Sequence, residues 1–195
     1  MKICLRYPRT LALLTAALML SACGGSGSSE VSLSGTATGV TSDGVILANV
    51  VNTVVMPITI PVNATTFAFP KRLQAGSTYS IYVQAEPVNL NCQVLTPTGV
   101  ASNNVTTLQL VCTPRNVLGG TVSGLTGSGL ALANGSDVVS VAANATTFSF
   151  TNRVTLDAAY GVTILTQPAG QTCTVTNGSG KMGSVDINSV QVSCS

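Results

Sequence analysis

Short runs of alternating apolar and polar residues recur along the chain from about residue 31 to its end. One clear run is Tyr160, Val162 and Ile164, which alternate with small or polar residues. A period of two is typical of a β-strand that buries one face. Turn-forming residues separate the runs, for example at 134–137 and 177–180. No segment has helical periodicity, so the pattern predicts units of about seven short antiparallel strands.

The same series of features occurs twice in the sequence. Residues 35–39 (GTATG) recur as 120–124 (GTVSG), and 63–69 (NATTFAF) recur as 144–150 (NATTFSF). Four further matches follow at one constant spacing: Arg72 with Arg153, Tyr79 with Tyr160, Pro87 with Pro168, and Cys92 with Cys173. Because the order is kept, the sequence predicts two tandem units, 31–113 and 116–195, with a very short joint between them.

The cysteines support this organisation. Two of the six lie near the N-terminus, and the other four are divided equally between the two units. Four cysteines allow three pairings, and the repeat selects Cys92–Cys112 and Cys173–Cys194. A redox pair or a metal site is the alternative, but the chain has neither CxxC nor His. We therefore expect one disulfide in each unit, worth roughly 3 kcal/mol for a loop of this length.

The N-terminal segment has the pattern of an export signal. A basic start precedes the apolar stretch Leu11–Leu20, which is too short to span a bilayer. The four residues that end in Cys23 (LSAC) resemble the lipobox of bacterial lipoproteins, in which the bond between Ala22 and Cys23 would be cut and the thiol acylated. The alternative is an ordinary signal peptide that ends in Ala-Cys. We expect residues 1–22 to be the signal peptide and residues 23–30 to be the lipidated cysteine and a flexible tether.

Acyl chains on Cys23 make the membrane the expected partner, because two or three chains hold a protein firmly in a bilayer. In the enteric lipoproteins that this segment resembles, Asp after the cysteine retains the protein at the inner membrane. Gly24 stands at that place here. This favours the outer membrane and leaves open whether the protein faces the periplasm or the cell exterior.

The composition lacks the residues on which most enzymatic catalysis depends. The chain contains no His, and only 7% of its 195 residues are charged, against about 25% in average soluble domains. A Ser-His-Asp triad and His metal ligands are therefore excluded. After loss of the signal peptide, five basic and six acidic side chains give a net charge of −1, which offers nothing to a nucleic acid. We expect a non-enzymatic protein without cofactor, metal or nucleic-acid partner.

The features of the second unit resemble a tandem module of predicted bacterial lipoproteins. The pattern of that module runs from Gly-Thr-Val-Ser-Gly-Leu through Phe-x-Phe and Gly-x-x-Tyr to paired cysteines. The match rests on residues 120–125, 167–168 and 173–175, while the first unit departs from it at Ala37 and Val40. A more distant likeness is to carboxypeptidase-regulatory and Cna-B type sandwiches. The resemblance covers nearly all of the mature chain and implies envelope β-modules without catalytic residues.

Together, these features predict an all-β fold. We expect two tandem Ig-like or prealbumin-like antiparallel β-sandwiches with one disulfide each, after a cleaved lipoprotein signal peptide.

Three side chains are candidates for contact with a partner. The segment 50–62 is apolar and uncharged, and it is four residues longer than its counterpart in the second unit. If this segment is exposed, Met56 and Ile58 would dock a partner; the alternative is a longer buried strand of the first sandwich. Tyr82 alternates with apolar neighbours and has Thr163 as its counterpart, so we expect it to be exposed.

The expected function is that of a structural or interaction module of the bacterial cell envelope, which presents or spaces a surface from the outer membrane. One alternative is an adhesin that binds protein or glycan, and another is a subunit of an envelope complex. A binder would expose a contiguous apolar or aromatic patch of several hundred Å², whereas a spacer would not.

Overall fold

The computed structural model describes residues 29–195. All regular structure in these residues is β-strand, and each half carries one disulfide. The prediction of an all-β fold is therefore confirmed. Within the described residues there is no helix of the length and apolarity needed to cross a membrane. The predicted signal peptide and lipidation site lie outside this range.

The N-terminal half is a sandwich of two sheets around one hydrophobic core. Its sheets have the strand orders β5-β2-β10-β8 and β4-β3-β7-β9, and β1 pairs with β6 beside them. The strands are β1 Glu30–Val31, β2 Leu33–Thr38, β3 Val45–Val51, β4 Val54–Ile60, β5 Thr66–Ala68, β6 Leu73–Gln74, β7 Ser77–Ala85, β8 Leu90–Leu95, β9 Thr98–Ala101 and β10 Val105–Asn116. Leu47 and Ile81 from one sheet and Leu108 and Leu110 from the other are fully buried in this core.

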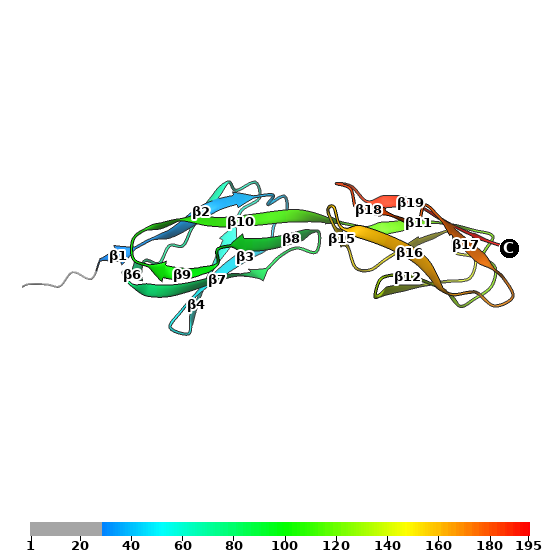
Figure 1. Ribbon diagram of the computed structural model, residues 1–195, viewed down its shortest axis with the longest axis horizontal. Helices are drawn as coiled ribbons and strands as arrows, with labels where there is room; N and C mark the ends of the chain where they lie inside the picture. The colour runs from blue at the N-terminus through cyan, green and yellow to red at the C-terminus, as the bar shows by residue number, and fades with distance from the viewer. Residues whose placement is uncertain (1–28) are drawn as a thin grey trace, which may run out of the picture.

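The C-terminal half is a second sandwich with a core of its own. Its sheets have the orders β14-β11-β19-β17 and β13-β12-β16-β18. The strands are β11 Leu118–Ser123, β12 Leu130–Asn134, β13 Asp137–Val141, β14 Thr147–Ser149, β15 Val154–Thr155, β16 Ala159–Thr166, β17 Cys173–Thr176, β18 Ser179–Lys181 and β19 Ile187–Cys194. Figure 1 shows the two halves end to end, with the C-terminus at the end far from β1.

Strand pairing follows the same order in both halves. The first long strand of each half pairs antiparallel with the strand of the Phe-x-Phe motif, which is β5 for β2 and β14 for β11. The same strand pairs parallel with the last strand of its half, which is β10 for β2 and β19 for β11. The sequence pattern predicted antiparallel sheets and did not reveal these parallel pairs. A parallel pair between strands about 70 residues apart needs a long crossover and leaves no local signature.

One glycine in each half permits this parallel pairing. A Cβ at Gly35 would clash with the carbonyl of Leu108, and a Cβ at Gly120 would clash with the carbonyl of Val190. The register of both parallel pairs shifts at this point. The first glycine of each GTxxG motif is therefore required because two backbones approach closely.

The second glycine of each motif ends the strand. Gly39 has φ +73° and Gly124 has φ +72°, a region that other residues rarely adopt. A Cβ at these positions would clash with the carbonyl oxygens of Cys112 and Cys194, respectively. The motif thus lets β2 approach β10 closely at Cys112, and lets β11 approach β19 closely at Cys194.

Replacement of Gly120 by Ala should lower the free energy of unfolding by at least about 2 kcal/mol, because the methyl group meets backbone atoms that cannot move aside. Gly161→Ala is the matched control in the same half, since a Cβ there has nothing within 4 Å. It should change the free energy by less than about 1 kcal/mol. Urea unfolding of both variants tests this, and equal effects would contradict the role assigned to Gly120.

Candidate functional site

Each disulfide joins directly opposed residues of two antiparallel neighbours. Cys92 of β8 lies opposite Cys112 of β10, and Cys173 of β17 lies opposite Cys194 of β19. The S–S distances are 2.05 and 2.03 Å. The disulfide thus fastens β8 to β10 and β17 to β19, and β10 and β19 are the strands that also form the parallel pairs.

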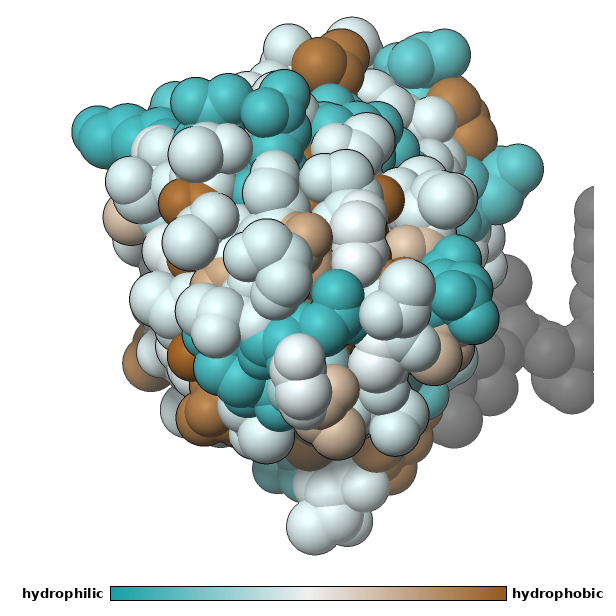
Figure 2. Space-filling view, turned by 90° about the vertical axis from the view of Figure 1, so that its right-hand side faces the viewer, coloured by the Kyte–Doolittle hydropathy of each residue, from teal (hydrophilic) through white to brown (hydrophobic). Residues whose placement is uncertain are grey.

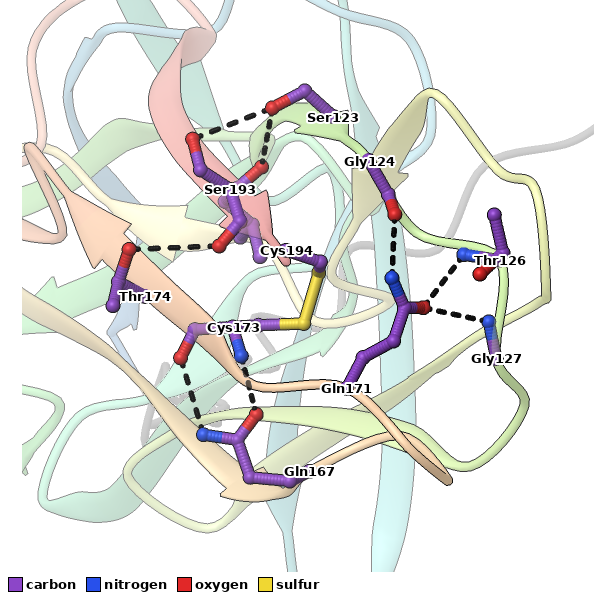
Figure 3. The surroundings of a disulfide bond; sticks show 11 residues. Ser123, Gly124, Thr126, Gly127, Gln167, Gln171, Cys173, Thr174, Ser193 and Cys194 are labelled. Atoms are coloured by element: carbon purple, nitrogen blue, oxygen red, sulfur yellow. Dashed lines mark hydrogen bonds between the residues drawn. A yellow bond between two sulfur atoms is a disulfide. The ribbon is translucent and has the colours of Figure 1, made fainter.

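A carboxylate or carboxamide accompanies each disulfide, six residues before its first cysteine. Gln167 accepts a hydrogen bond from the backbone N–H of Cys173 (2.8 Å) and donates one to its carbonyl (3.1 Å), as Figure 3 shows. In the N-terminal half, Glu86 accepts from the backbone N–H of Cys92 at 2.6 Å. The sequence reasoning missed this role. The available signal was that both residues precede a proline and stand at the same distance from the cysteine.

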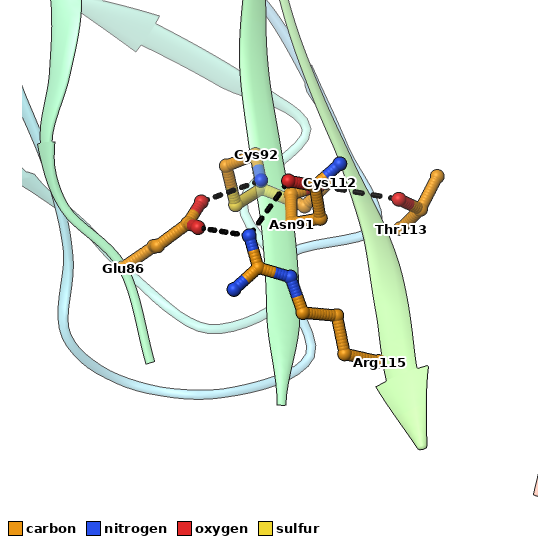
Figure 4. A network of polar contacts seen from close by, with 6 residues as sticks. All are labelled: Glu86, Asn91, Cys92, Cys112, Thr113 and Arg115. Carbon is orange, nitrogen blue, oxygen red and sulfur yellow. Dashed lines mark hydrogen bonds and ion pairs between the residues drawn. A yellow bond between two sulfur atoms is a disulfide. The ribbon is translucent and has the colours of Figure 1, made fainter. Parts of the chain in front are cut away.

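Glu86 also connects the first disulfide to the junction between the halves. Its other carboxylate oxygen accepts from Arg115 at 2.7 Å, and the same guanidinium nitrogen donates to Asn91 Oδ1 at 2.7 Å (Figure 4). Gln167 has no such arginine partner in the described residues. The ion pair is therefore a feature of the junction and not of the fold that both halves share.

The junction is a strand and not a linker. Strand β10 runs unbroken through residues 113–115 and, beyond its own half, pairs with β15 of the C-terminal half. Leu156 N–H donates to the carbonyl of Pro114 at 2.9 Å. A chain fixed in this way on both sides has little freedom to bend.

Side-chain contacts between the two halves close the junction further. Asn116 donates to the carbonyl of Gly183 at 2.7 Å, and Asp186 accepts from the backbone N–H of Val117 at 2.7 Å. Arg153 donates to the carbonyl of Arg115 at 3.4 Å and lies 3.8 Å from the carboxylate of Asp186. The arginine that the repeat singled out thus contacts the neighbouring half.

Met56 and Ile58 do not form an exposed surface. Both are half-buried and pack against the core of the N-terminal half, and Ile60 in the same row is fully buried. Strand β4 is the edge strand of its sheet, and its outward face carries Val55, Pro57 and Thr59. Met56 and Ile58 therefore belong to a longer strand of the first sandwich, which is the alternative to an exposed docking segment.

Tyr82 lies on the outer face of the same sheet and is 42% exposed, as expected. The strand register places it in one row with Ala48 and Pro57. Exposed Val55 on β4 and Val100 on β9 lie on the same outward face. A partner therefore has access to apolar side chains on this face of β4-β3-β7-β9.

The longer β3–β4 hairpin also leaves a polar side chain in the core. Asn49 is fully buried, and neither its Oδ1 nor its Nδ2 has a hydrogen-bond partner. Its counterpart Asn134 stands at the end of the shorter β12–β13 hairpin, where its Oδ1 accepts from Gly161 N–H at 2.9 Å. In the N-terminal half the ladder extends further, to Val50 opposite Ser80. The longer ladder therefore covers Asn49, which lacks the hydrogen bond that Asn134 accepts from Gly161.

The part of the chain that the structure describes contains no metal-binding cluster. Within residues 29–195, no group of three His, Cys, Asp or Glu side chains is arranged to hold a metal ion. The end of the molecule at the C-terminus has hydrophobic residues scattered among residues of intermediate hydropathy (Figure 2). The predicted cleavage and lipidation residues, Ala22 and Cys23, lie outside the described residues.

No protein-family model matches the chain, and no curated protein sequence matches it. Among solved structures, it is similar to the Bacillus anthracis TIE protein, with a TM-score of 0.32 and 13% identity over 85% of this chain and 34% of that chain. It is also similar to the shaft pilin SpaA of Lactobacillus rhamnosus GG, with a TM-score of 0.31 and 13% identity over 86% and 99% of the chains. For a major pilin of Streptococcus pyogenes, the TM-score is 0.28 and the identity 8% over 85% and 95%. At TM-scores this low, the description of the fold rests on the strand pairing of this chain alone.

Replacement of Glu86 by Gln should cost less than about 1 kcal/mol of unfolding free energy, because Gln167 serves Cys173 in the same way and a partly exposed ion pair contributes little. Glu86→Leu should cost about 1–3 kcal/mol, because the N–H of Cys92 then loses its partner. Urea unfolding of the oxidised protein measures both. Equal losses would show that the ion pair with Arg115, and not the bond to Cys92, is the important contact.

Replacement of Asn49 by Val should raise the free energy of unfolding by about 1 kcal/mol or more, because it removes two polar atoms that have no partner in the core. The same change at Asn134 should lower it by about 1 kcal/mol, because a hydrogen bond to Gly161 is lost. Thermal unfolding of the two variants compares them directly. A loss of stability in Asn49→Val would indicate that the buried amide is satisfied.

Proposed function

We propose that this chain is a non-enzymatic, lipid-anchored spacer of the bacterial cell envelope. It consists of a cleaved signal peptide, an acylated Cys23 with a short tether, and two sandwiches over 31–113 and 116–195. Its task is to hold a surface or a partner at a fixed distance from the outer membrane. The lipobox-like sequence before Cys23 supports the anchor.

The continuous strand β10 is the observation that carries this proposal. A flexible two-domain binder would separate its domains by a polar linker. Here residues 113–115 are part of a strand that is paired on both sides of the junction. The junction also contains an ion pair on each side, Glu86–Arg115 and Arg153–Asp186. Two sandwiches fixed end to end form a stiff rod, which is what a spacer requires.

An adhesin is the second candidate, supported by the outer face of β4-β3-β7-β9. Tyr82, Val55 and Val100 are exposed on this face. Aromatic side chains are enriched in the centres of protein interfaces and also stack on sugar rings. In this version the rod presents the face to a partner outside the cell.

Cys23→Ser should abolish acylation and move the protein from the membrane fraction to the soluble fraction, because the serine hydroxyl cannot take the thioether-linked lipid. Cys4→Ser is the matched control, since it changes a cysteine within the predicted signal peptide. Mass spectrometry of the mature N-terminus and fractionation of cells measure the outcome. A wild-type protein whose N-terminal mass shows no acyl chain on Cys23 would overturn the anchor.

Protease treatment of intact cells, with a lysed control, then separates the two candidate functions. Cleavage on intact cells places the rod outside, and a Tyr82→Ser variant that loses binding to host protein or glycan at unchanged melting temperature would favour the adhesin. Protection until lysis places the rod in the periplasm and rejects the adhesin. Crosslinking would then identify the envelope partner that the spacer holds.

A further inference from the structure

Three features of the N-terminal half meet at the end that lies farthest from the C-terminal half. They are the β1–β6 pair, the basic residues just before β6, and the tip of the β3–β4 hairpin, which projects from the sandwich in Figure 1. Residues from all three line one hollow of about 290 Å³. They include Glu30, Val51, Asn52, Val54, Lys71 and Arg72. The features are thus neighbours in space, although they are distant in sequence.

The hairpin tip exposes two valines beside its turn. Strands β3 and β4 have seven residues each, whereas β12 and β13 have five each. The extension carries the turn Asn52-Thr53, with φ of 47° and 70°, away from the sheet. Val54 and Val55 beside the turn are 52% and 46% exposed. Two adjacent exposed valines on a protruding hairpin are available to an apolar surface outside the protein.

Within residues 29–195, Lys71 and Arg72 form no ion pair, although Glu30 lines the same hollow. Arg153 lies 3.8 Å from Asp186, which also accepts from the N–H of Val117. At the corresponding place in the N-terminal half, Asn104 accepts from the N–H of Ser32. An asparagine therefore replaces the aspartate, and Arg72 remains exposed beside exposed Lys71.

The expected anchor is attached at this same end. Ser29 accepts from the N–H of Ala75, and β1 follows it directly. Cys23 stands six residues before Ser29, and an extended chain spans at most about 3.6 Å per residue. If Cys23 is acylated, this end of the rod lies within roughly 20 Å of the lipid surface.

We propose that this anchor end, defined as Val54, Val55, Lys71 and Arg72, is a second contact with the lipid layer. The inference rests on the proposed lipid anchor. Val54 and Val55 enter the headgroup region, while Lys71 and Arg72 bind lipid phosphates, a combination that favours an anionic layer. The short tether supplies a millimolar effective concentration, so even a weak contact is occupied. Two contacts, the acylated Cys23 and this surface, fix the direction of the rod relative to the membrane, which a single attachment point does not.

The test places the mature chain, from residue 23, on vesicles without relying on acylation in the cell. The mature chain lacks Cys4, so Cys23 is its one cysteine outside the two disulfides, and a maleimide lipid couples to it alone. Vesicles of phosphatidylethanolamine with phosphatidylglycerol are compared with vesicles of phosphatidylcholine. Hydrogen exchange of residues 52–55 is measured, because these amides lie at the hairpin tip.

Exchange at the tip should slow at least about fivefold on the anionic vesicles relative to the neutral ones. Val54→Ser with Val55→Ser, or Lys71→Ser with Arg72→Ser, should remove the difference. Val138→Ser with Lys181→Ser is the matched control, since both residues are exposed in the C-terminal half, and it should leave the difference intact. Unchanged melting temperatures exclude loss of the fold.

Equal exchange on both kinds of vesicle would overturn the lipid contact, whether or not the native protein is acylated. The mass of the native N-terminus, measured separately, tests the anchor. Slowed exchange together with an unacylated native Cys23 would overturn the anchor and leave the surface as a lipid-binding face. The two failures are therefore distinguishable.

Discussion

Both halves of this protein depend on the close contact between the strand of the GTxxG motif and the last strand of the half, which carries the second cysteine. Strand β2 lies parallel to β10, and β11 lies parallel to β19, with a separation that any Cβ at Gly35 or Gly120 would prevent. The disulfide then fastens the next strand to the other side of β10 or β19. Each core also contains one edge-to-face phenylalanine pair. The three adjacent strands β2-β10-β8, or β11-β19-β17 in the second half, form the framework to which the remaining strands add.

The junction between the halves extends this framework. The strand that forms the centre of the first sheet continues until it pairs with β15 of the second half. The β1–β6 pair at the start of the N-terminal half has the same antiparallel form, with Glu30 opposite Gln74. A short antiparallel pair thus closes the same end of each sandwich: β1–β6 in the N-terminal half and β10–β15 in the C-terminal half. At the junction the preceding sandwich supplies the strand, and at the anchor end the residues after the tether supply it.

Two differences between the halves concern the hairpin and the arginine beside the anchor end. The longer hairpin buries Asn49 without a partner, which costs stability in the core. The exchange of an aspartate for Asn104 leaves Arg72 without the counter-ion that Arg153 has. Neither change improves the sandwich in which it occurs. Both change what the molecule presents at the end where the expected tether is attached, which is why we connect them with the lipid surface.

The sequence by itself determined the all-β class and the disulfide pairing, because the period of two and the matched cysteine positions are local or repeated signals. It also predicted that Tyr82 is exposed. Only the tertiary structure decided that Met56 and Ile58 face the core, since an uncharged apolar strand reads the same on either face. The parallel pairs, the bond from Glu86 to Cys92 and the unbroken β10 join residues through space. Their partners are fixed by close packing of the whole sandwich, which no short stretch of sequence records.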